Sequence, residues 1–427
     1  MKTSRIAVLM VLLAPSMLLT AASVATEDFV IKVFGNANMD ETIGEEDIEY
    51  VQGIIDGTNV ETDLADANYD GKIDEEDIAQ IELVINGREK EITIIDMADR
   101  NVTVPRPIER VACISTLDEV RTILQLEAAD KIVGVTDYIA KSDPARLVCV
   151  QAYPELKDLP STGADDLPNM EQILSLKPDI AFCSAQFPST ADSVQEKTGI
   201  PVVCITHSPS YVPAYMRDDP TRTPFEQQFE AYRIAGKVLG KEDEAENLIS
   251  YIGEELDKVT DVTSEIPEGE KPKVFFTRSS DTAVTFYDPI LLSGGINVAS
   301  EMMPLTGSTS NLKISKEQII LWDPDLILIH GFGKTHTYSV ENLLDDSDLQ
   351  LVSAVKNRAI YYTKGWYVGW DPATGLAECF YLAKLFHPDE FEDLDVEAEG
   401  NAILERFYGV EGLYTWMLEN SDLHRWE

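Results

Sequence analysis

Side chains that carry oxygen recur at regular spacing in a short acidic segment, a pattern that can bind a divalent cation. In residues 66–77, positions 1, 3, 5, 7, 9 and 12 of a calcium-type loop are Asp66, Asn68, Asp70, Lys72 (through its backbone carbonyl), Asp74 and Asp77. Gly71 occupies position 6, where such a loop turns sharply. Calcium takes about six to eight oxygen ligands, so the sequence predicts a calcium site here.

A second copy of this pattern begins thirty residues earlier in the chain. Its members are Asn36, Asn38, Asp40, Thr42 (through its carbonyl) and Asp47. Asn36 replaces the usual first aspartate and Glu41 replaces the turn glycine, so we expect this loop to bind calcium more weakly. An acidic run that is merely solvated remains the alternative.

Each loop leads into a helical pattern, at residues 48–55 and 78–85, so residues 28–88 predict a small all-α calcium-binding module. Paired loops of this kind, each ending in Asp and followed by one helix, resemble a type I dockerin. The resemblance implies calcium as a cofactor and a cohesin domain as a partner. Glu45-Glu46 and Glu75-Glu76 are acidic where dockerins of cellulosomes usually carry small hydroxyl residues, so a calcium-stiffened spacer without a cohesin remains open.

Composition and the first residues limit where the protein works. The chain has 427 residues and a formal net charge of -42, which disfavours nucleic acid as a partner and favours divalent cations. Residues 1–25 carry two basic residues, an apolar core and Ser23-Val24-Ala25 as a cleavage site, and so predict a signal peptide. We therefore expect an extracellular or cell-surface protein, although an uncleaved anchor stays open. No cysteine lies near the cleavage site for a lipid anchor, and no later apolar run is long enough to cross a membrane.

The five cysteines show neither a disulfide framework nor a zinc-site spacing, and we expect buried free thiols. They are Cys113, Cys149, Cys183, Cys204 and Cys379.

The longest helical pattern covers residues 223–266, where apolar residues recur at steps of three and four, and it predicts one continuous linking helix. A similar motif flanks it on both sides. Glu171-Gln172-Ile173 leads to Pro178-Asp179, and Glu317-Gln318-Ile319 leads to Pro324-Asp325. Residues 91–97 and 100–104 predict a hairpin. Short apolar runs then predict strands that alternate with helical segments, at residues 111–114, 132–135, 180–183, 202–205, 273–276, 326–329 and 359–362. We therefore expect two open α/β lobes at residues 92–222 and 267–427.

Residues 92–114, 168–180, 313–319 and 354–362 resemble the substrate-binding proteins of iron-siderophore and cobalamin ABC importers. The resemblance implies the class III periplasmic-binding-protein fold, in which two Rossmann-like α/β lobes are joined by one rigid helix. It also implies a cargo cleft, no enzymatic activity, and a permease dimer with its ATPase as partners. The glutamates of that family that match Glu171 and Glu317 dock on permease arginines; stabilisation of a helix end is the alternative role.

Ligands of open α/β sheets bind beyond the carboxyl ends of the strands, so the residues after each predicted strand are cleft candidates. They are Tyr138, Phe187, Arg278, His330, Trp366, Tyr367 and Trp370. Aromatic walls with one or two cations suit a bulky metal chelate, a ferric siderophore or a corrinoid such as cobalamin. An oxyanion such as molybdate or tungstate is the alternative within the fold. A secreted hydrolase, or a surface scaffold or adhesion protein acting through the dockerin-like module, are alternatives of other classes.

Overall fold

The computed structural model describes residues 30–141, 147–164, 167–206, 224–302, 311–331, 338–364 and 371–426. The predicted signal peptide lies outside these residues. Within them, no helix combines the length and the apolar character needed to cross a membrane.

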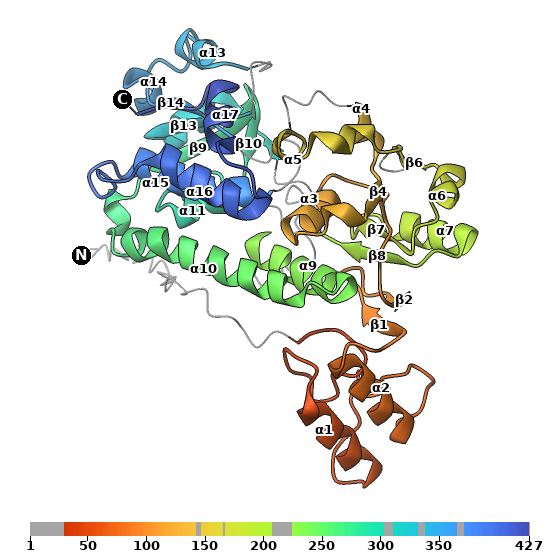
Figure 1. Cartoon of the computed structure of the whole chain (residues 1–427). Helices are drawn as coiled ribbons and strands as arrows, with labels where there is room; N and C mark the ends of the chain where they lie inside the picture. Colours follow the sequence, from red (N-terminus) through yellow and green to blue (C-terminus); the bar gives the residue numbers. More distant parts are fainter. Residues whose placement is uncertain are drawn as a thin grey trace, which may run out of the picture.

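The N-terminal module contains helices α1 (Glu45–Ile55) and α2 (Glu75–Ile85), each beginning three residues before its predicted start. The module forms a small separate domain beside the two lobes (Figure 1). Its small core is built from Ala37, Val51, Ala65, Ala67 and Ile81.

A hairpin joins this module to the rest of the chain. Strands β1 (Glu91–Ile95) and β2 (Asn101–Pro105) pair antiparallel, as the sequence predicts. The Phe34 amide donates to the Thr93 carbonyl at 2.9 Å, which attaches the module to β1. On the other side, the Asp96 carboxylate accepts from the Cys204 amide at 2.9 Å. The module is therefore hydrogen-bonded to the hairpin, and the hairpin to the N-terminal lobe.

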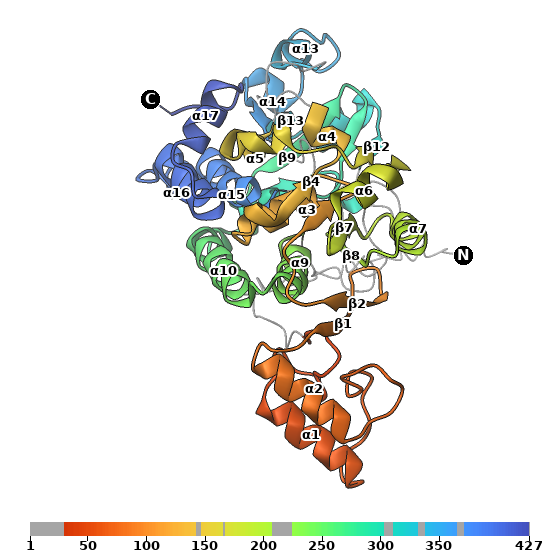
Figure 2. The same cartoon turned by 45° about the vertical axis from the view of Figure 1, so that its right-hand side comes forward.

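The N-terminal lobe has, within the described residues, a four-stranded parallel sheet in the order β4-β3-β7-β8. The strands are β3 (Val111–Cys113), β4 (Ile132–Gly134), β7 (Ile180–Ser184) and β8 (Val202–Ile205), all predicted from apolar runs. The other elements are α3 (Asp118–Gln125), η1 (Ala129–Lys131), α4 (Asp137–Lys141), α5 (Val148–Ala152), η3 (Pro154–Asp158), β5 (Gly163–Ala164), β6 (Leu167–Pro168), α6 (Met170–Leu176) and α7 (Pro188–Thr198). Helix α3 lies on one side of the sheet and α6 and α7 on the other (Figure 2).

The C-terminal lobe contains a six-stranded sheet in the described part of the chain, ordered β12-β10-β9-β13-β14 with β11 beside β9. The strands are β9 (Lys273–Ser279), β10 (Thr282–Val284), β11 (Ile296–Asn297), β12 (Asn311–Lys313), β13 (Leu326–His330) and β14 (Ile360–Thr363). The helices are η4 (Glu268–Glu270), α11 (Asp288–Leu292), η5 (Ser300–Met302), α12 (Lys316–Trp322), α13 (Val340–Leu344), α14 (Ser353–Lys356), α15 (Pro372–Phe386), α16 (Val396–Tyr408) and α17 (Leu413–Glu419). Both lobes are thus open α/β layers, as expected.

The prediction of one continuous helix over residues 223–266 is wrong. The segment forms two helices, α9 (Pro224–Leu239) and α10 (Glu242–Ser264). Gly240 between them adopts a left-handed conformation with φ 68°, which ends a helix and which glycine reaches without a Cβ clash. The helices then fold back on each other, since Arg233 of α9 pairs with Glu246 of α10 at 2.8 Å (Figure 1).

The close packing of this helical hairpin depends on a second glycine. A Cβ on Gly236 would lie 2.9 Å from the Cβ of Ala245, so a larger side chain there would push α9 and α10 apart. The predicted burial of the apolar stripe is confirmed, because Phe225, Phe229, Tyr232, Leu239, Leu248, Ile252, Leu256 and Val259 are all buried.

One hydrophobic core runs through both lobes and the hairpin. The same cluster includes Ile123 of α3, Ile252 of α10 and Leu404 of α16. A separate cluster, with Phe275, Ile327 and other side chains of the C-terminal lobe, is packed against α12 and α13. The lobes therefore share buried apolar surface in addition to their covalent link.

Candidate functional site

The repeated sequence motif folds into two equivalent capped helices, one in each lobe. Helices α6 and α12 are both seven residues long. The side chain of Asn169 caps α6 and that of Ser315 caps α12, and each accepts a hydrogen bond from the backbone of the third residue that follows it. Both helices end at a left-handed residue, Lys177 or Asp323.

The strand entries after these helices also match. Oδ2 of Asp179 accepts the Arg110 amide at 2.8 Å, and Oδ2 of Asp325 accepts the Lys273 amide at 2.9 Å. Each aspartate thus joins the start of its own strand to the chain that enters the neighbouring strand. The repeated Pro-Asp pair has a structural role.

Glu171 and Glu317 lie in the first turns of these helices, and both are exposed. Hydrogen bonds from its own backbone amide and from the Ser315 hydroxyl lower the pKa of Glu317. Three residues further along, Leu174 is 47% exposed and Ile320 is 40% exposed. Each lobe therefore presents a carboxylate and an apolar side chain from the same position of the same kind of helix.

The described cleft candidates lie where the sequence places them, near the carboxyl ends of strands. Tyr138, in α4 after β4, is 38% exposed, and Phe187 precedes α7 after β7 and is half-buried. Arg278 lies near the end of β9, and His330 is the last residue of β13. The predicted aromatic group Trp366, Tyr367 and Trp370 lies outside the described residues.

Arg278 is an exposed cation near the carboxyl end of β9. Desolvation by the surrounding protein lowers the pKa of its guanidinium. The side chain is nevertheless exposed. A guanidinium that reaches solvent can pair with an anionic group of a ligand.

His330 is mostly buried, and its imidazole stacks on Phe276 with ring centroids 5.9 Å apart. Its place at a strand end agrees with the prediction, but packing within its own lobe occupies one face of the ring.

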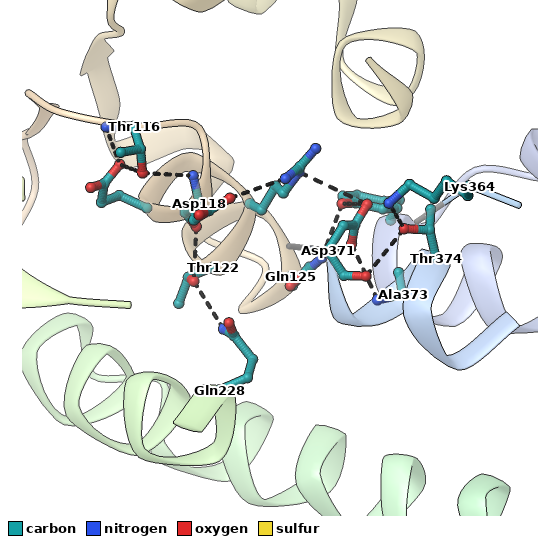
Figure 3. Close-up of polar contacts among 12 residues, drawn as sticks. Thr116, Asp118, Thr122, Gln125, Gln228, Lys364, Asp371, Ala373 and Thr374 are labelled. Atoms are coloured by element: carbon teal, nitrogen blue, oxygen red, sulfur yellow. Dashed lines mark hydrogen bonds and ion pairs between the residues drawn. The ribbon is translucent and has the colours of Figure 1, made fainter. Parts of the chain in front are cut away.

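The sequence did not reveal a buried polar layer that connects the two lobes (Figure 3). In the N-terminal lobe, Nη1 of Arg121 donates to Oδ1 of Asp118 at 3.0 Å. Nε of the same arginine lies 3.9 Å from Oδ2 of Asp371 in the C-terminal lobe. The Lys364 ammonium donates to the Thr374 hydroxyl one helical turn into α15. All five side chains are buried.

Asp371 is the centre of this layer. Its Oδ1 accepts from Nε2 of Gln125 at 3.1 Å, and its Oδ2 accepts from the Tyr408 hydroxyl at 3.1 Å. The Tyr232 hydroxyl donates to Oε1 of Gln125 at 2.6 Å, which adds helix α9 to the network. The Asp118-x-x-Arg121 spacing on a helix is a signal for a local ion pair. Nothing in the sequence places Asp371 beside them.

Burial shifts the proton affinities of this layer. Desolvation raises the pKa of Asp118 to about 6, partly opposed by Arg121, and lowers the pKa of Lys364 to about 8. Next to Asp118, desolvation raises the pKa of Glu119 to about 8. Glu119 accepts from the Ser115 hydroxyl and from the Thr116 amide, the latter at 2.9 Å. The layer can hold the lobes together.

The two acidic loops of the N-terminal module share one geometry. In the second loop, Oδ1 of Asp77 accepts from the Asn68 amide at 3.1 Å, and its Oδ2 accepts from the Asp74 amide at 2.8 Å. In the first loop, Asp47 accepts from the Asn38 and Gly44 amides at 3.1 and 2.8 Å. The predicted loop repeat is therefore present as a structural repeat.

The donor set of the second loop suits a cation. Burial raises the pKa of Asp77, and the charges of Asp66 and Asp74 raise it further, so the carboxylates repel one another. In the first loop the Asn36 amide donates to the Ile31 and Asp40 carbonyls at 2.9 and 2.6 Å, a role that an aspartate could not fill. Across the described residues, however, no group of three or more His, Cys, Asp or Glu side chains is arranged to hold a metal ion. Calcium binding remains a prediction.

Comparison with known proteins gives the family. A family model described as "Periplasmic binding protein" matches residues 111–366. The molybdate-binding protein MolA of Haemophilus influenzae is 24% identical over 330 residues, which is 74% of this chain and 90% of MolA. The structure of MolA bound to molybdate has a TM-score of 0.61 at 21% identity and covers 75% of this chain and 98% of that one.

Two further solved structures share the fold. A periplasmic solute-binding protein from Veillonella parvula has a TM-score of 0.61 at 22% identity, covering 78% of this chain and 96% of that one. Helicobacter pylori CeuE in a Ni-His complex has a TM-score of 0.55 at 18% identity, covering 78% of this chain and all of that one (100%). These likenesses confirm the expected two-lobe α/β fold. The family match begins at residue 111, so it does not include the dockerin-like module. Since the match covers more than half of the described chain, the protein belongs to the periplasmic binding protein family, whose members are solute-binding components of ABC transporters and not enzymes themselves.

Proposed function

We propose that this protein captures an anionic metal chelate, a ferric siderophore or a corrinoid, between its lobes and delivers it to the permease of an ABC importer. The observation that carries the delivery role is the pair Glu171 and Glu317. They are exposed at the same position of two equivalent helices, one in each lobe. A permease dimer with its ATPase offers two equivalent docking sites for such a pair.

Helix-end stabilisation does not explain these glutamates fully. The side chains of Asn169 and Ser315 already cap the two helices. An exposed carboxylate in the first turn then adds only the interaction with the helix dipole, about 0.3 to 1 kcal/mol. Docking on basic side chains of a partner gives both carboxylates a common role.

Charge reversal tests the docking role. Glu171→Lys combined with Glu317→Lys should abolish cargo uptake and transporter-stimulated ATP hydrolysis in reconstituted vesicles, while cargo affinity and melting temperature stay nearly unchanged. Glu341→Lys is a matched control, because Glu341 is exposed, follows a Ser339 cap and has a pKa lowered in the same way as that of Glu317. Uptake that persists in the double variant, or that Glu341→Lys impairs equally, would refute the assignment.

The cargo assignment is supported by the exposed guanidinium of Arg278 and by the exposed ring of Tyr138. Together they offer a positive charge and an aromatic surface, which suit a bulky anionic chelate. The CeuE complex with nickel and histidine supports the proposal, because it is a metal chelate on the same fold.

An oxyanion is the second candidate, and a specific observation favours it. MolA is a molybdate-binding protein and is similar in sequence over 74% of this chain. Arg278 would serve an oxyanion as well as a chelate. Thermal-shift titration with molybdate, tungstate, sulfate, ferric siderophores and cobalamin separates the two proposals. Stabilisation by cobalamin or a ferric siderophore alone supports the chelate, and stabilisation by molybdate or tungstate but not sulfate supports the oxyanion.

For residues 28–88 we propose a calcium-dependent module on the outside of the cell, with a cohesin domain as the partner to test. Repulsion among the carboxylates around Asp77 supports calcium as the ion that stabilises the second loop. Pull-down with a panel of cohesin domains in calcium and in chelator tests the partner. Binding that requires calcium supports it, and the absence of binding in both leaves a stiff spacer as the better description.

A further inference from the structure

Two of the five cysteines lie directly opposite each other in the N-terminal sheet. Strands β7 and β8 run parallel, and Cys183 and Cys204 are register partners. Both side chains are completely buried, and both are free thiols in this structure. Neighbouring strands lie about 4.8 Å apart. A disulfide requires a Cα separation of roughly 4.4 to 6.8 Å, so the backbone spacing here is within the range that a disulfide needs.

The side chains of Cys183 and Cys204 lie on the same face of the sheet, because register partners on neighbouring strands project to the same side. The Cys183 thiol donates to the Phe187 carbonyl at 3.7 Å. Nη1 of Arg100 lies 3.4 Å from Sγ of Cys204 and approaches from the β1-β2 hairpin. Cys113, on the other neighbour of β7, is aligned with Phe182 and not with Cys183. Because side chains alternate between the faces of a sheet, Cys113 points to the opposite face from the pair.

We propose that Cys183 and Cys204 form an intramolecular cross-strand disulfide when the chain folds in an oxidising environment. In this reaction one thiol displaces half of a low-molecular-weight disulfide, such as oxidised glutathione, to give a mixed disulfide. The second thiol then displaces the remaining half. The two protein thiols lose two protons and two electrons, and the small disulfide is reduced to two thiols.

The bond should form during folding and not by later oxidation of the native protein. The contact with Cys183 and burial raise the pKa of the Cys204 thiol well above its usual range. The thiolate is the reactive form, so the Cys204 thiol is poorly reactive once the sheet has closed. The unfolded chain exposes both thiols to the oxidant, and folding then brings them together.

The position of the pair gives the bond a structural consequence. Among the described strands, β8 lies at the edge of the N-terminal sheet. The residues that follow the pair, Ser184 and Ile205-Thr206, lead into the carboxyl-end rim of that sheet. The Ser184 hydroxyl donates to the Thr206 carbonyl at 3.3 Å. A disulfide would fix β8 to β7 directly beneath this rim, independently of what the cleft binds.

Oxidative refolding tests the proposal on the full chain. The chain is denatured and reduced, then refolded in a glutathione redox buffer or in excess dithiothreitol. Free thiols are alkylated after unfolding in denaturant, and peptides are mapped by mass spectrometry. We expect one linked pair, Cys183 with Cys204, only in the glutathione sample, with the other three cysteines alkylated. Cys113→Ser should retain the linked pair, and Cys204→Ser should lose it.

Two results would overturn the proposal. One is alkylation of all five cysteines in wild-type protein that has refolded in glutathione, as judged by native circular dichroism. The other is a linked peptide that joins different cysteines. Because the wild-type result alone decides the question, a variant that fails to fold does not obscure it.

Discussion

Removing the Asp371 side chain should destabilise the protein far more than removing an ordinary helix cap. Asp371 is buried and caps α15 by accepting the Ala373 amide at 3.1 Å. It also accepts from Gln125 and Tyr408 and lies next to Arg121 across the interlobe boundary. Asp371→Ala would leave the Tyr408 hydroxyl without its acceptor and take one of two acceptors from the Gln125 amide, which keeps the Tyr408 hydroxyl at 3.0 Å. It would also leave Arg121 without one of its carboxylates.

The magnitude follows from these losses. A helix cap contributes about 1 kcal/mol, and each buried donor left without an acceptor costs about 1 to 3 kcal/mol. Loss of one partner from a buried ion pair costs about 3 to 5 kcal/mol, but Arg121 retains Asp118 at 3.0 Å, so the lower limit applies. Because such losses are not additive, we expect a decrease of about 4 to 6 kcal/mol in the free energy of unfolding.

Urea unfolding at pH 7 measures this change, and Asp395→Ala is the matched control. Asp395 caps α16 by accepting the Ala398 amide at 3.0 Å, but it is exposed. Its replacement should cost about 1 kcal/mol. If Asp371→Ala costs no more than Asp395→Ala, the polar layer does not stabilise the contact between the lobes and our interpretation is wrong. Retained cargo affinity in Asp371→Asn would show that the residue positions the lobes without contacting cargo.

Three further predictions concern protonation, calcium and lobe motion. Burial raises the pKa of Glu119 from its usual 4.5 to about 8, so its contribution to stability is complete below about pH 4.5 and is lost as the pH rises through about 8. Urea unfolding of Glu119→Gln should therefore show higher stability than wild type at pH 8 and little change at pH 5; equal pH profiles would contradict this. If the loops bind calcium, a chelator should unfold the N-terminal module while the lobes stay folded, and Asp70→Ala should weaken calcium binding more than Asp40→Ala. A circular dichroism spectrum of the module that is the same with calcium and with chelator would exclude the site. Since the lobes share a core, cargo should change the radius of gyration by less than about 1 Å in X-ray scattering, and a change of several ångströms would refute a rigid pair of lobes.

Strands with continuous apolar runs were predictable because both of their faces are buried. Examples are Ile180–Ser184 and Leu326–His330, which match their predicted positions. Strands β10 and β12 were missed because each has only three residues and includes polar side chains, so neither shows a period. The break at Gly240 was signalled by a glycine followed by an acidic helix start, yet the apolar stripe on both sides gave the stronger signal.

The residues of the candidate site also fall into those that the sequence predicts and those that it does not. Glu171 and Glu317 were predictable because a repeated local motif places them, and local motifs depend on neighbouring residues in the sequence. The contact between Arg121 and Asp371 depends on how α3 and α15 pack across the lobes. No periodic pattern in the sequence predicts which residues of α3 and α15 meet, because their contact is set by tertiary structure. The opposed cysteines are an intermediate case, because predicting two adjacent parallel strands does not fix their register.

The two lobes resemble each other on their exposed surface but differ in how they pack against each other. Outside, α6 and α12 present the same capped helix and the same exposed glutamate from each lobe. Inside, the lobes are unlike, because α15 and α16 of the C-terminal lobe share a core and a polar layer with α3 and α9. A ligand shifts a conformational equilibrium only by its difference in affinity for the two states. With the lobes joined by buried apolar and ionic contacts, a widely opened state is costly. A permease that docks on the two glutamates would therefore meet nearly the same spacing with and without cargo, and it must distinguish a loaded protein by the cargo itself or by small changes at the rim of the cleft.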